Sequence, residues 1–118
     1  MVPCRDNLAR STGKIKVVTL PYPSSYGVLK MTLGDELDAL SVNRVMRGII
    51  LDFSHVMTIG PVEYREIQGF VECLKLLGIG CALCGFTISV SAALAKSGKH
   101  FSNIPVAANL EQATELFA

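Results

Sequence analysis

Tryptophan is absent from the sequence and charge is scarce, with Asp, Glu, Lys and Arg making up 18% of the 118 residues. The charges nearly cancel, since the chain has 11 basic and 10 acidic side chains and a formal net charge of +1. Such a chain offers no electrostatic surface for nucleic acid or an anionic membrane. No hydrophobic run approaches the roughly 18 residues of a membrane-spanning helix, and the first residues lack the apolar segment of a secretory signal. We therefore expect a cytoplasmic protein that neither crosses a membrane nor binds nucleic acid.

Histidine is also sparse, which limits the catalytic sites that the chain could build. Neither His55 nor His100 has a sequence context that indicates a catalytic base, and each is better explained as a solvated loop residue. The spacing of serine, cysteine, histidine and acidic residues defines no nucleophilic triad or dyad. We therefore predict no catalytic residue, no cofactor and no enzyme activity.

The four cysteines, at positions 4, 73, 81 and 84, leave one alternative open. Cys81 and Cys84 have the C-x-x-C spacing that can hold a metal or a redox disulfide. Residues 80–86 (GCALCGF), however, have the composition of a strand, in which positions three apart point to opposite faces. We therefore favour reduced thiols that pack as small hydrophobic side chains, without a metal site. An enzyme using either cysteine would need a thiol that reacts quickly at neutral pH.

Hydrophobic residues are plentiful, at 50% of the chain, which is enough for one globular domain with an ordinary core. Residues 1–13 are polar without periodicity and are expected to form an N-terminal arm, so that the domain spans 14–118. Residues 16–20 are rich in β-forming side chains, and 28–33 (VLKMTL) alternate between two faces. The alternation predicts a half-buried strand that pairs antiparallel with 16–20, followed by a short helix over 38–46.

The remainder of the chain alternates between strand and helix patterns. The apolar run 49–53 predicts a strand buried on both faces, and Asp52 within it should accept hydrogen bonds from backbone amides at the strand end. After Pro61 the hydrophobic spacing becomes helical, and Gly78 ends that helix. Further predictions are a strand over 80–86, a helix capped by Ser89 and ended by Gly98, a strand over 104–109 and a last helix capped by Asn109 with Gln112. This order predicts an α/β fold with a mixed, mainly parallel sheet of about four or five strands and about four helices.

Several of these segments, taken in order, resemble the STAS domain of bacterial anti-sigma-factor antagonists and of the cytoplasmic ends of some anion transporters. The segments are GIILDFSHV (48–56), LLGIG (76–80), CGFT (84–87) and AKSG (95–98). In addition, GDELDALSV (34–42) resembles the start of the family's first helix. The stretch from LLG to AKSG is most similar to the stressosome scaffold and antagonist branch, and the resemblance covers residues from about 27 to 117.

The resemblance directs attention to the corner between the strand 49–53 and the helix after Pro61. In phosphorylated STAS proteins this corner carries an Asp followed by a Ser or Thr, which a partner kinase phosphorylates. Counting from Asp52, the Asp falls on Gly60 and the hydroxyl residue on Pro61 or Val62, none of which can accept phosphate. Thr58 is the nearest hydroxyl and is an alternative phosphosite, although it precedes the turn.

Two interpretations of this corner remain open. The run Gly60-Pro61-Val62-Glu63 can simply be a well-capped helix start, because proline suits the first helical position and an acid in the first turn favours the helix dipole. Alternatively, the corner is a docking surface held in one state. By position, the family's partner contacts would fall on Ser54, His55, Thr58, Gly60, Pro61, Val62, Glu63 and Arg65.

The function that the resemblance implies is a non-catalytic interaction module of bacterial partner-switching signalling. The chain would be an anti-sigma-factor antagonist or a stressosome component, and its partners would be an anti-sigma factor kinase or STAS scaffold paralogues. A homodimer or a larger assembly is expected. The alternative is a small-ligand-binding STAS sensor that holds a nucleotide or lipid near Thr58 to Glu63.

Overall fold

The computed structural model describes residues 14–20, 26–42, 46–98, 101 and 104–117. The predicted N-terminal arm, Cys4 and His100 lie outside these ranges. Over the described ranges, no helix is both long and apolar enough to cross a membrane.

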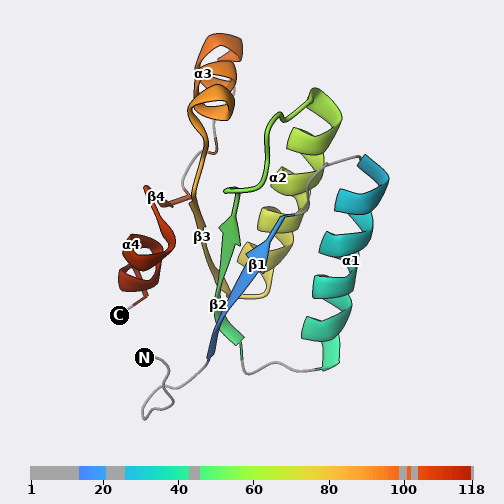
Figure 1. The fold of residues 1–118 in the computed structure, drawn as a ribbon. Coiled ribbons are helices and arrows are strands. Elements are labelled where there is room, and N and C mark those ends of the chain that lie inside the picture. The colour runs from blue at the N-terminus through green and yellow to red at the C-terminus, as the bar shows by residue number, and fades with distance from the viewer. Residues whose placement is uncertain (1–13, 21–25, 43–45, 99–100, 102–103, 118) are drawn as a thin grey trace.

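Strands and helices alternate along the described chain, and the strands form one parallel sheet in the order β1-β2-β3-β4 (Figure 1). Because parallel neighbours need a crossover connection, each pair of consecutive strands is joined through a helix. The strands are β1 (Lys14–Thr19), β2 (Met46–Asp52), β3 (Gly80–Cys84) and β4 (Val106–Ala107). The helices are α1 (Tyr26–Val42), α2 (Pro61–Leu76), α3 (Ile88–Ser97) and α4 (Leu110–Glu115). The predicted α/β class with a mainly parallel sheet is confirmed.

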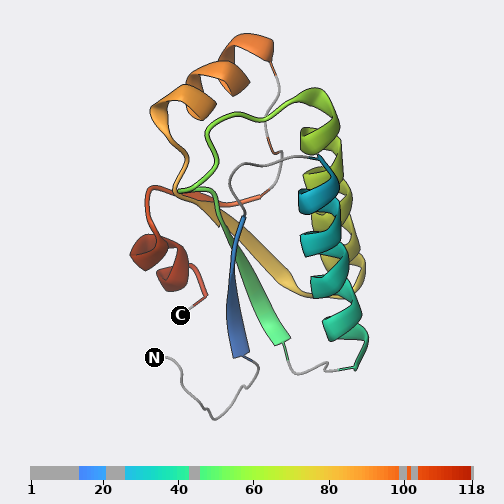
Figure 2. The same cartoon turned by 45° about the vertical axis from the view of Figure 1, so that its right-hand side comes forward.

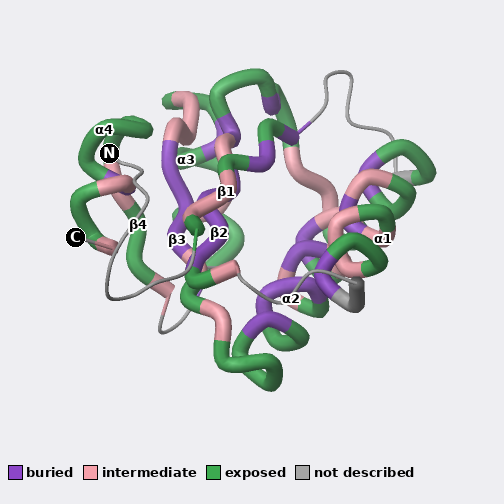
Figure 3. Tube along the Cα trace, turned by 90° about the horizontal axis from the view of Figure 1, so that it is seen from below, coloured by how far each residue is buried: buried purple, intermediate pink, exposed green. Residues whose placement is uncertain are grey.

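The sheet lies between helices, with α1 and α2 against one face and α4 against the other (Figures 1 and 2). Alternate residues of β2 therefore enter different clusters: Ile49 and Leu51 join the large core under α1 and α2, while Ile50 packs with Ala113 of α4. All three are fully buried, and Figure 3 shows the buried stretches gathered where the sheet meets the helices. Burial on both faces explains the continuous apolar run of β2.

The prediction of an antiparallel strand over 28–33 is wrong, because these residues belong to α1. Leu29, Leu33 and Leu40 are almost completely buried, whereas Met31, which the alternating pattern placed on one face with Leu29 and Leu33, is 65% exposed. The leucine spacing is that of one helical face over a longer window than six residues. The expected helix over 38–46 is displaced for the same reason, since α1 ends at Val42 and Met46 already begins β2.

The helix ends agree with the sequence in most places. Helix α2 begins at Pro61, and Gly78 follows it with a φ of 76°, a conformation that glycine adopts without strain. Gly98 ends α3 in the left-handed region as predicted, and the Asn109 side chain accepts a hydrogen bond from the Gln112 amide at 2.9 Å. The cap of α3 was predicted wrongly: Thr87 rather than Ser89 accepts the hydrogen bond, from the Val90 amide at 3.2 Å.

The last predicted strand is shorter than expected. Of residues 104–109, only Val106 and Ala107 pair with β3, opposite Leu83 and Cys84. Pro105 has no amide hydrogen to donate to a ladder, which limits the extension of β4 toward its N-terminal side.

Candidate functional site

The segment from Ser54 to Arg65, called here the β2–α2 corner, leaves the sheet at the carboxyl end of β2. The residue just before the corner, Phe53, is fixed to the sheet, because its amide donates to the Cys84 carbonyl at 2.9 Å and its side chain is fully buried. The carboxylate of Asp52 accepts a hydrogen bond from the Ser54 amide at 3.0 Å. This contact confirms the predicted role of Asp52 as a backbone acceptor at the strand end.

A second corner, between β3 and α3, packs against the first. Gly85 has a φ of 78°, and a Cβ atom at that position would lie 2.7 Å from the Asp52 Oδ1 atom and 3.2 Å from the Ser54 amide nitrogen. Only glycine therefore allows the two corners to approach this closely. Gly85 was not among the residues predicted for the site, although its position directly after a buried strand was a usable signal.

A cluster of aromatic rings supports both corners from below. The ring centroids of Phe53 and Phe86 are 4.4 Å apart, and those of Tyr64 and Phe101 are 5.0 Å apart. Phe53 directly precedes the first corner, Phe86 belongs to the second, and Tyr64 lies in the first turn of α2. Aromatic pairs at these separations contribute roughly 0.5–1.5 kcal/mol each beyond the area that they bury. The two corners therefore pack against this aromatic cluster, which is called the aromatic base below.

The start of α2 is closed by backbone geometry and by Glu63. Gly60 is the N-cap residue in extended conformation and offers no side-chain cap, while Pro61 occupies the first helical position. The Glu63 carboxylate folds back over Gly60, where a Cβ would lie 2.5 Å from the Glu63 Oε1 atom. Its negative charge therefore lies at the positive end of the helix dipole, the place that a phosphate would otherwise favour.

The residues predicted as partner contacts all lie on this corner, and most are accessible. Gly60 and Glu63 are partly buried, and the exposed members are Ser54, His55, Thr58, Pro61, Val62 and Arg65. The structure adds two exposed hydrophobic side chains that the sequence analysis missed, Met57 at 51% and, at the start of α3, Ile88 at 89%. Met57 lies in a segment with the composition of a polar loop, and Ile88 follows a helix cap. Their exposure could therefore be determined only from the folded structure.

The hollow beside the corner is too small for an organic ligand. It lies between the corner, the start of α2 and the core, and it encloses about 10 Å³, about the volume of a single water. Its lining consists of Leu20, Leu29, Val56, Thr58, Ile59, Glu63 and Ile67. In the described part of the chain, this hollow beside Thr58 and Glu63 is therefore smaller than a nucleotide or lipid, and the predicted ligand site there stays a prediction.

The two cysteines of the C-x-x-C spacing lie on opposite faces of the sheet, as predicted. Cys81 packs against the large core, whereas Cys84 belongs to the small cluster under α4. Burial raises the pKa of the Cys81 thiol to about 12, and burial together with the negative charge of Asp52 raises the pKa of Cys84. Neither thiol is thus activated as a nucleophile. Within the described ranges, no group of three or more His, Cys, Asp or Glu residues could hold a metal ion.

Comparison with known proteins finds a curated relative, although no family model matches the chain. The RsbT co-antagonist protein RsbRB of Bacillus subtilis (strain 168) is 30% identical over 84 residues. The match covers 71% of this chain but 30% of that protein, so the chain spans less than a third of the relative's length.

Three solved structures with the same fold are described here. A serine-to-glutamate variant of RsbS from Moorella thermoacetica matches with a TM-score of 0.68 at 19% identity, covering 85% of this chain and 84% of that one. A sulfate transporter family protein from Wolinella succinogenes matches with a TM-score of 0.71 at 19% identity, covering 86% and 83%. A chain of the stressosome architecture matches with a TM-score of 0.64 at 17% identity, covering 86% of each. At these identities the structural matches establish the fold, and each covers at least 85% of this chain.

Proposed function

Since the chain belongs to the STAS domain family, we propose that it is a non-catalytic interaction module of bacterial partner-switching signalling. It acts in the cytoplasm as an anti-sigma-factor antagonist or as a stressosome component. The relative RsbRB is named as a co-antagonist of RsbT. By analogy, the partners proposed for this chain are an anti-sigma factor kinase or further STAS chains, with which it forms a homodimer or a larger assembly.

The observation that carries the proposal is the accessible, rigidly supported β2–α2 corner. It presents polar side chains such as His55 and Arg65 together with the half-exposed Met57 and Val62, at 51% and 42%. A mixture of apolar, polar and cationic groups is typical of protein interfaces. The hydrogen bond from the Ser54 amide to Asp52 and the aromatic base below hold the surface in one shape, so little conformational entropy is lost when a partner docks.

The corner is proposed to work without the phosphorylation that controls other STAS domains. Gly60, Pro61 and Val62 carry no hydroxyl group. The Glu63 carboxylate lies over Gly60 and would repel a phosphate placed at the same helix end. A single carboxylate carries less charge than a phosphate, so the corner represents one fixed binding state rather than a full imitation of the phosphorylated one.

Affinity capture from a lysate of the source cell tests this proposal. The tagged wild-type chain should recover an anti-sigma factor kinase or a STAS paralogue, identified by mass spectrometry. A Pro61→Asp, Glu63→Lys double variant should lose that partner, because it changes the shape and reverses the charge of the corner. Glu111→Lys is the matched control, since Glu111, like Glu63, is an acid in the first turn of a helix, here α4, and it lies outside the corner.

Circular dichroism must show that all three proteins are folded before the comparison is made. Recovery of the partner by wild type and Glu111→Lys alone supports docking through the corner. Equal recovery by the double variant would contradict it, and so would the absence of both kinds of partner from the wild-type sample.

A further inference from the structure

A pocket of about 290 Å³ opens far from the β2–α2 corner, at the opposite end of β3. Its size is near the lower end of the range for small-molecule sites, about 300 Å³. The late turns of α2, the start of β3, residues 104 and 105 and the end of α4 surround it. The residues used below are Val71, Lys75, Ile79, Cys81, Ile104 and Phe117.

Phe117 and Gly80 both line this pocket, and Gly48 lies next to the Phe117 ring. Gly48 and Gly80 are partners in the register of β2 and β3, and the Phe117 ring lies against both of them. A Cβ on Gly80 would be 2.8 Å from the Phe117 Cε1 atom, so a larger residue there would displace the ring. The Arg47 guanidinium donates a hydrogen bond to the Phe117 carbonyl oxygen. The ring is therefore held in place from the sheet and from the backbone.

The walls are hydrophobic, and the charge at the rim is positive. Val71 is 1% exposed, and Ile79 and Ile104 are partly buried against the core. The thiol of Cys81 stays neutral, because burial raises its pKa to about 12. Among the residues that line the pocket, Lys75 alone is charged.

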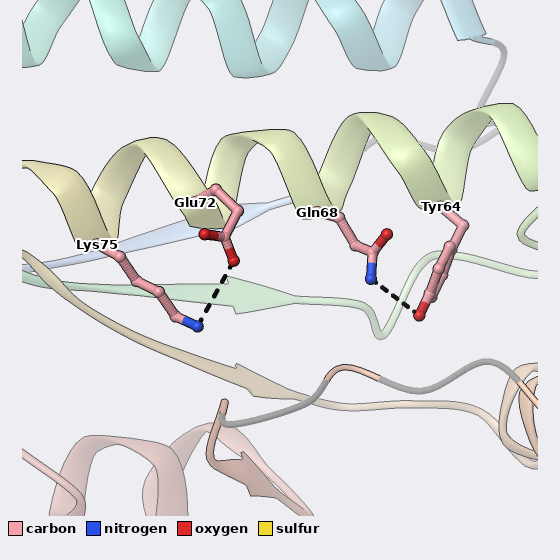
Figure 4. A network of polar contacts seen from close by, with 4 residues as sticks. All are labelled: Tyr64, Gln68, Glu72 and Lys75. Carbon is pink, nitrogen blue, oxygen red and sulfur yellow. Dashed lines mark hydrogen bonds and ion pairs between the residues drawn. The ribbon is translucent and has the colours of Figure 1, made fainter.

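Lys75 can reach a second anion because its present ion pair is loose. Its Nζ atom lies 3.6 Å from the Glu72 Oε2 atom, and the side chains are 41% and 69% exposed, respectively. Figure 4 shows both on the side of α2 that is turned away from α1, in line with Gln68 and Tyr64. Exposed pairs of this kind are weak, so the ammonium group can exchange Glu72 for a carboxylate that approaches from the pocket.

We propose that this pocket binds an amphipathic monocarboxylate, with its hydrocarbon chain against Ile79, Ile104 and Phe117 and its carboxylate at the Lys75 ammonium group. The apolar lining accounts for the chain, since burial of hydrocarbon supplies the non-directional part of the affinity. The single cation, Lys75, accounts for a headgroup that carries one negative charge. The site is separate from the corner, so it adds a ligand to a domain whose docking surface lies at the other end.

Titration of the full chain with octanoate, followed by backbone amide NMR shifts, tests the proposal. Saturable shifts are expected at Ile79–Ala82 and at Leu116 and Phe117. Octylamine, which has the same chain and the opposite charge, should bind at least about tenfold more weakly. Lys75→Gln should weaken octanoate binding about tenfold, whereas Glu72→Gln should leave it unchanged or tighten it, because the competing carboxylate is removed.

Both substitutions lie on an exposed helix face, so the variants are expected to fold. The absence of saturable shifts in the pocket would overturn the proposal, and so would equal binding by wild type and Lys75→Gln. The Pro61→Asp, Glu63→Lys variant should bind octanoate like wild type, which separates this result from the outcome of the partner-capture experiment.

Discussion

At the scale of single residues, the site depends on a few contacts between segments far apart in the sequence. Asp52 was expected to satisfy backbone amides, and it does so at Ser54. Its proximity to Gly85, by contrast, could not be predicted, because the sequence does not indicate which loops meet at the edge of a parallel sheet. The same limit applies to Phe117 and its two glycines, which are about 70 and 40 positions apart along the chain but in contact in the fold.

The buried thiol of Cys81 predicts a specific pH dependence of stability. Its pKa is raised to about 12 by burial, so at pH 10 the unfolded chain has lost this proton while the folded chain retains it. The free energy of unfolding should therefore fall as pH rises above the unfolded pKa, by about 1 kcal/mol between pH 8 and pH 10. Urea unfolding of wild type and Cys81→Ala at both pH values measures the difference.

Other groups in the chain also titrate in this pH range. The effect of Cys81 is therefore measured by the difference in unfolding free energy between wild type and Cys81→Ala. The loss between pH 8 and pH 10 should be smaller in Cys81→Ala by about 1 kcal/mol. An identical loss in both proteins would mean that the Cys81 thiol ionises equally well in the folded state.

At the scale of elements, strong periodicity over a long window was predictive and short alternation was misleading. The spacing of buried residues in α2 identified that helix together with its proline start and glycine end. In α1, six residues that satisfy a strand pattern are part of a helix of 17 residues. Tertiary context decided the outcome there, because parallel β1 and β2 require a crossover helix between them.

The cap of α3 gives a test that distinguishes the observed helix start from the one predicted by sequence. Helix α3 buries only Val90 among its described side chains, so its ends contribute strongly to its stability. Thr87→Ala removes the acceptor of the Val90 amide hydrogen bond and should lower the stability of α3 by about 1 kcal/mol. Amide hydrogen exchange within α3 should accelerate about fivefold accordingly.

Ser89→Ala is the matched control for this measurement. Ser89 is exposed and lies inside the helix, where alanine has the higher helix propensity. Exchange in α3 should therefore be unchanged or slower in this variant. Faster amide exchange in Ser89→Ala than in Thr87→Ala would instead identify Ser89 as the N-cap residue of α3.

At the scale of the whole molecule, the two ends of the sheet have different characters. The carboxyl ends of β2 and β3 carry two corners in contact, with exposed side chains of mixed chemistry over a packed aromatic base. The opposite end of β3 carries a hydrophobic pocket with one cation at its rim. The first of these ends was predicted from the sequence as a strand-to-helix corner, and the family resemblance implied that partners bind there. The pocket was beyond prediction because its walls come from four separate segments.

Site-specific photo-crosslinking from Val62 in the source cell tests the central proposal most directly. Val62 is 42% exposed on the first turn of α2, so a crosslinking side chain there projects from the corner without disturbing the core. Glu115, exposed on α4, is the control position. We expect Val62 to crosslink to a STAS paralogue or an anti-sigma factor kinase, identified by mass spectrometry, and Glu115 to give little of that product. Crosslinks to such a partner from Glu115 but not from Val62 would contradict docking through the β2–α2 corner.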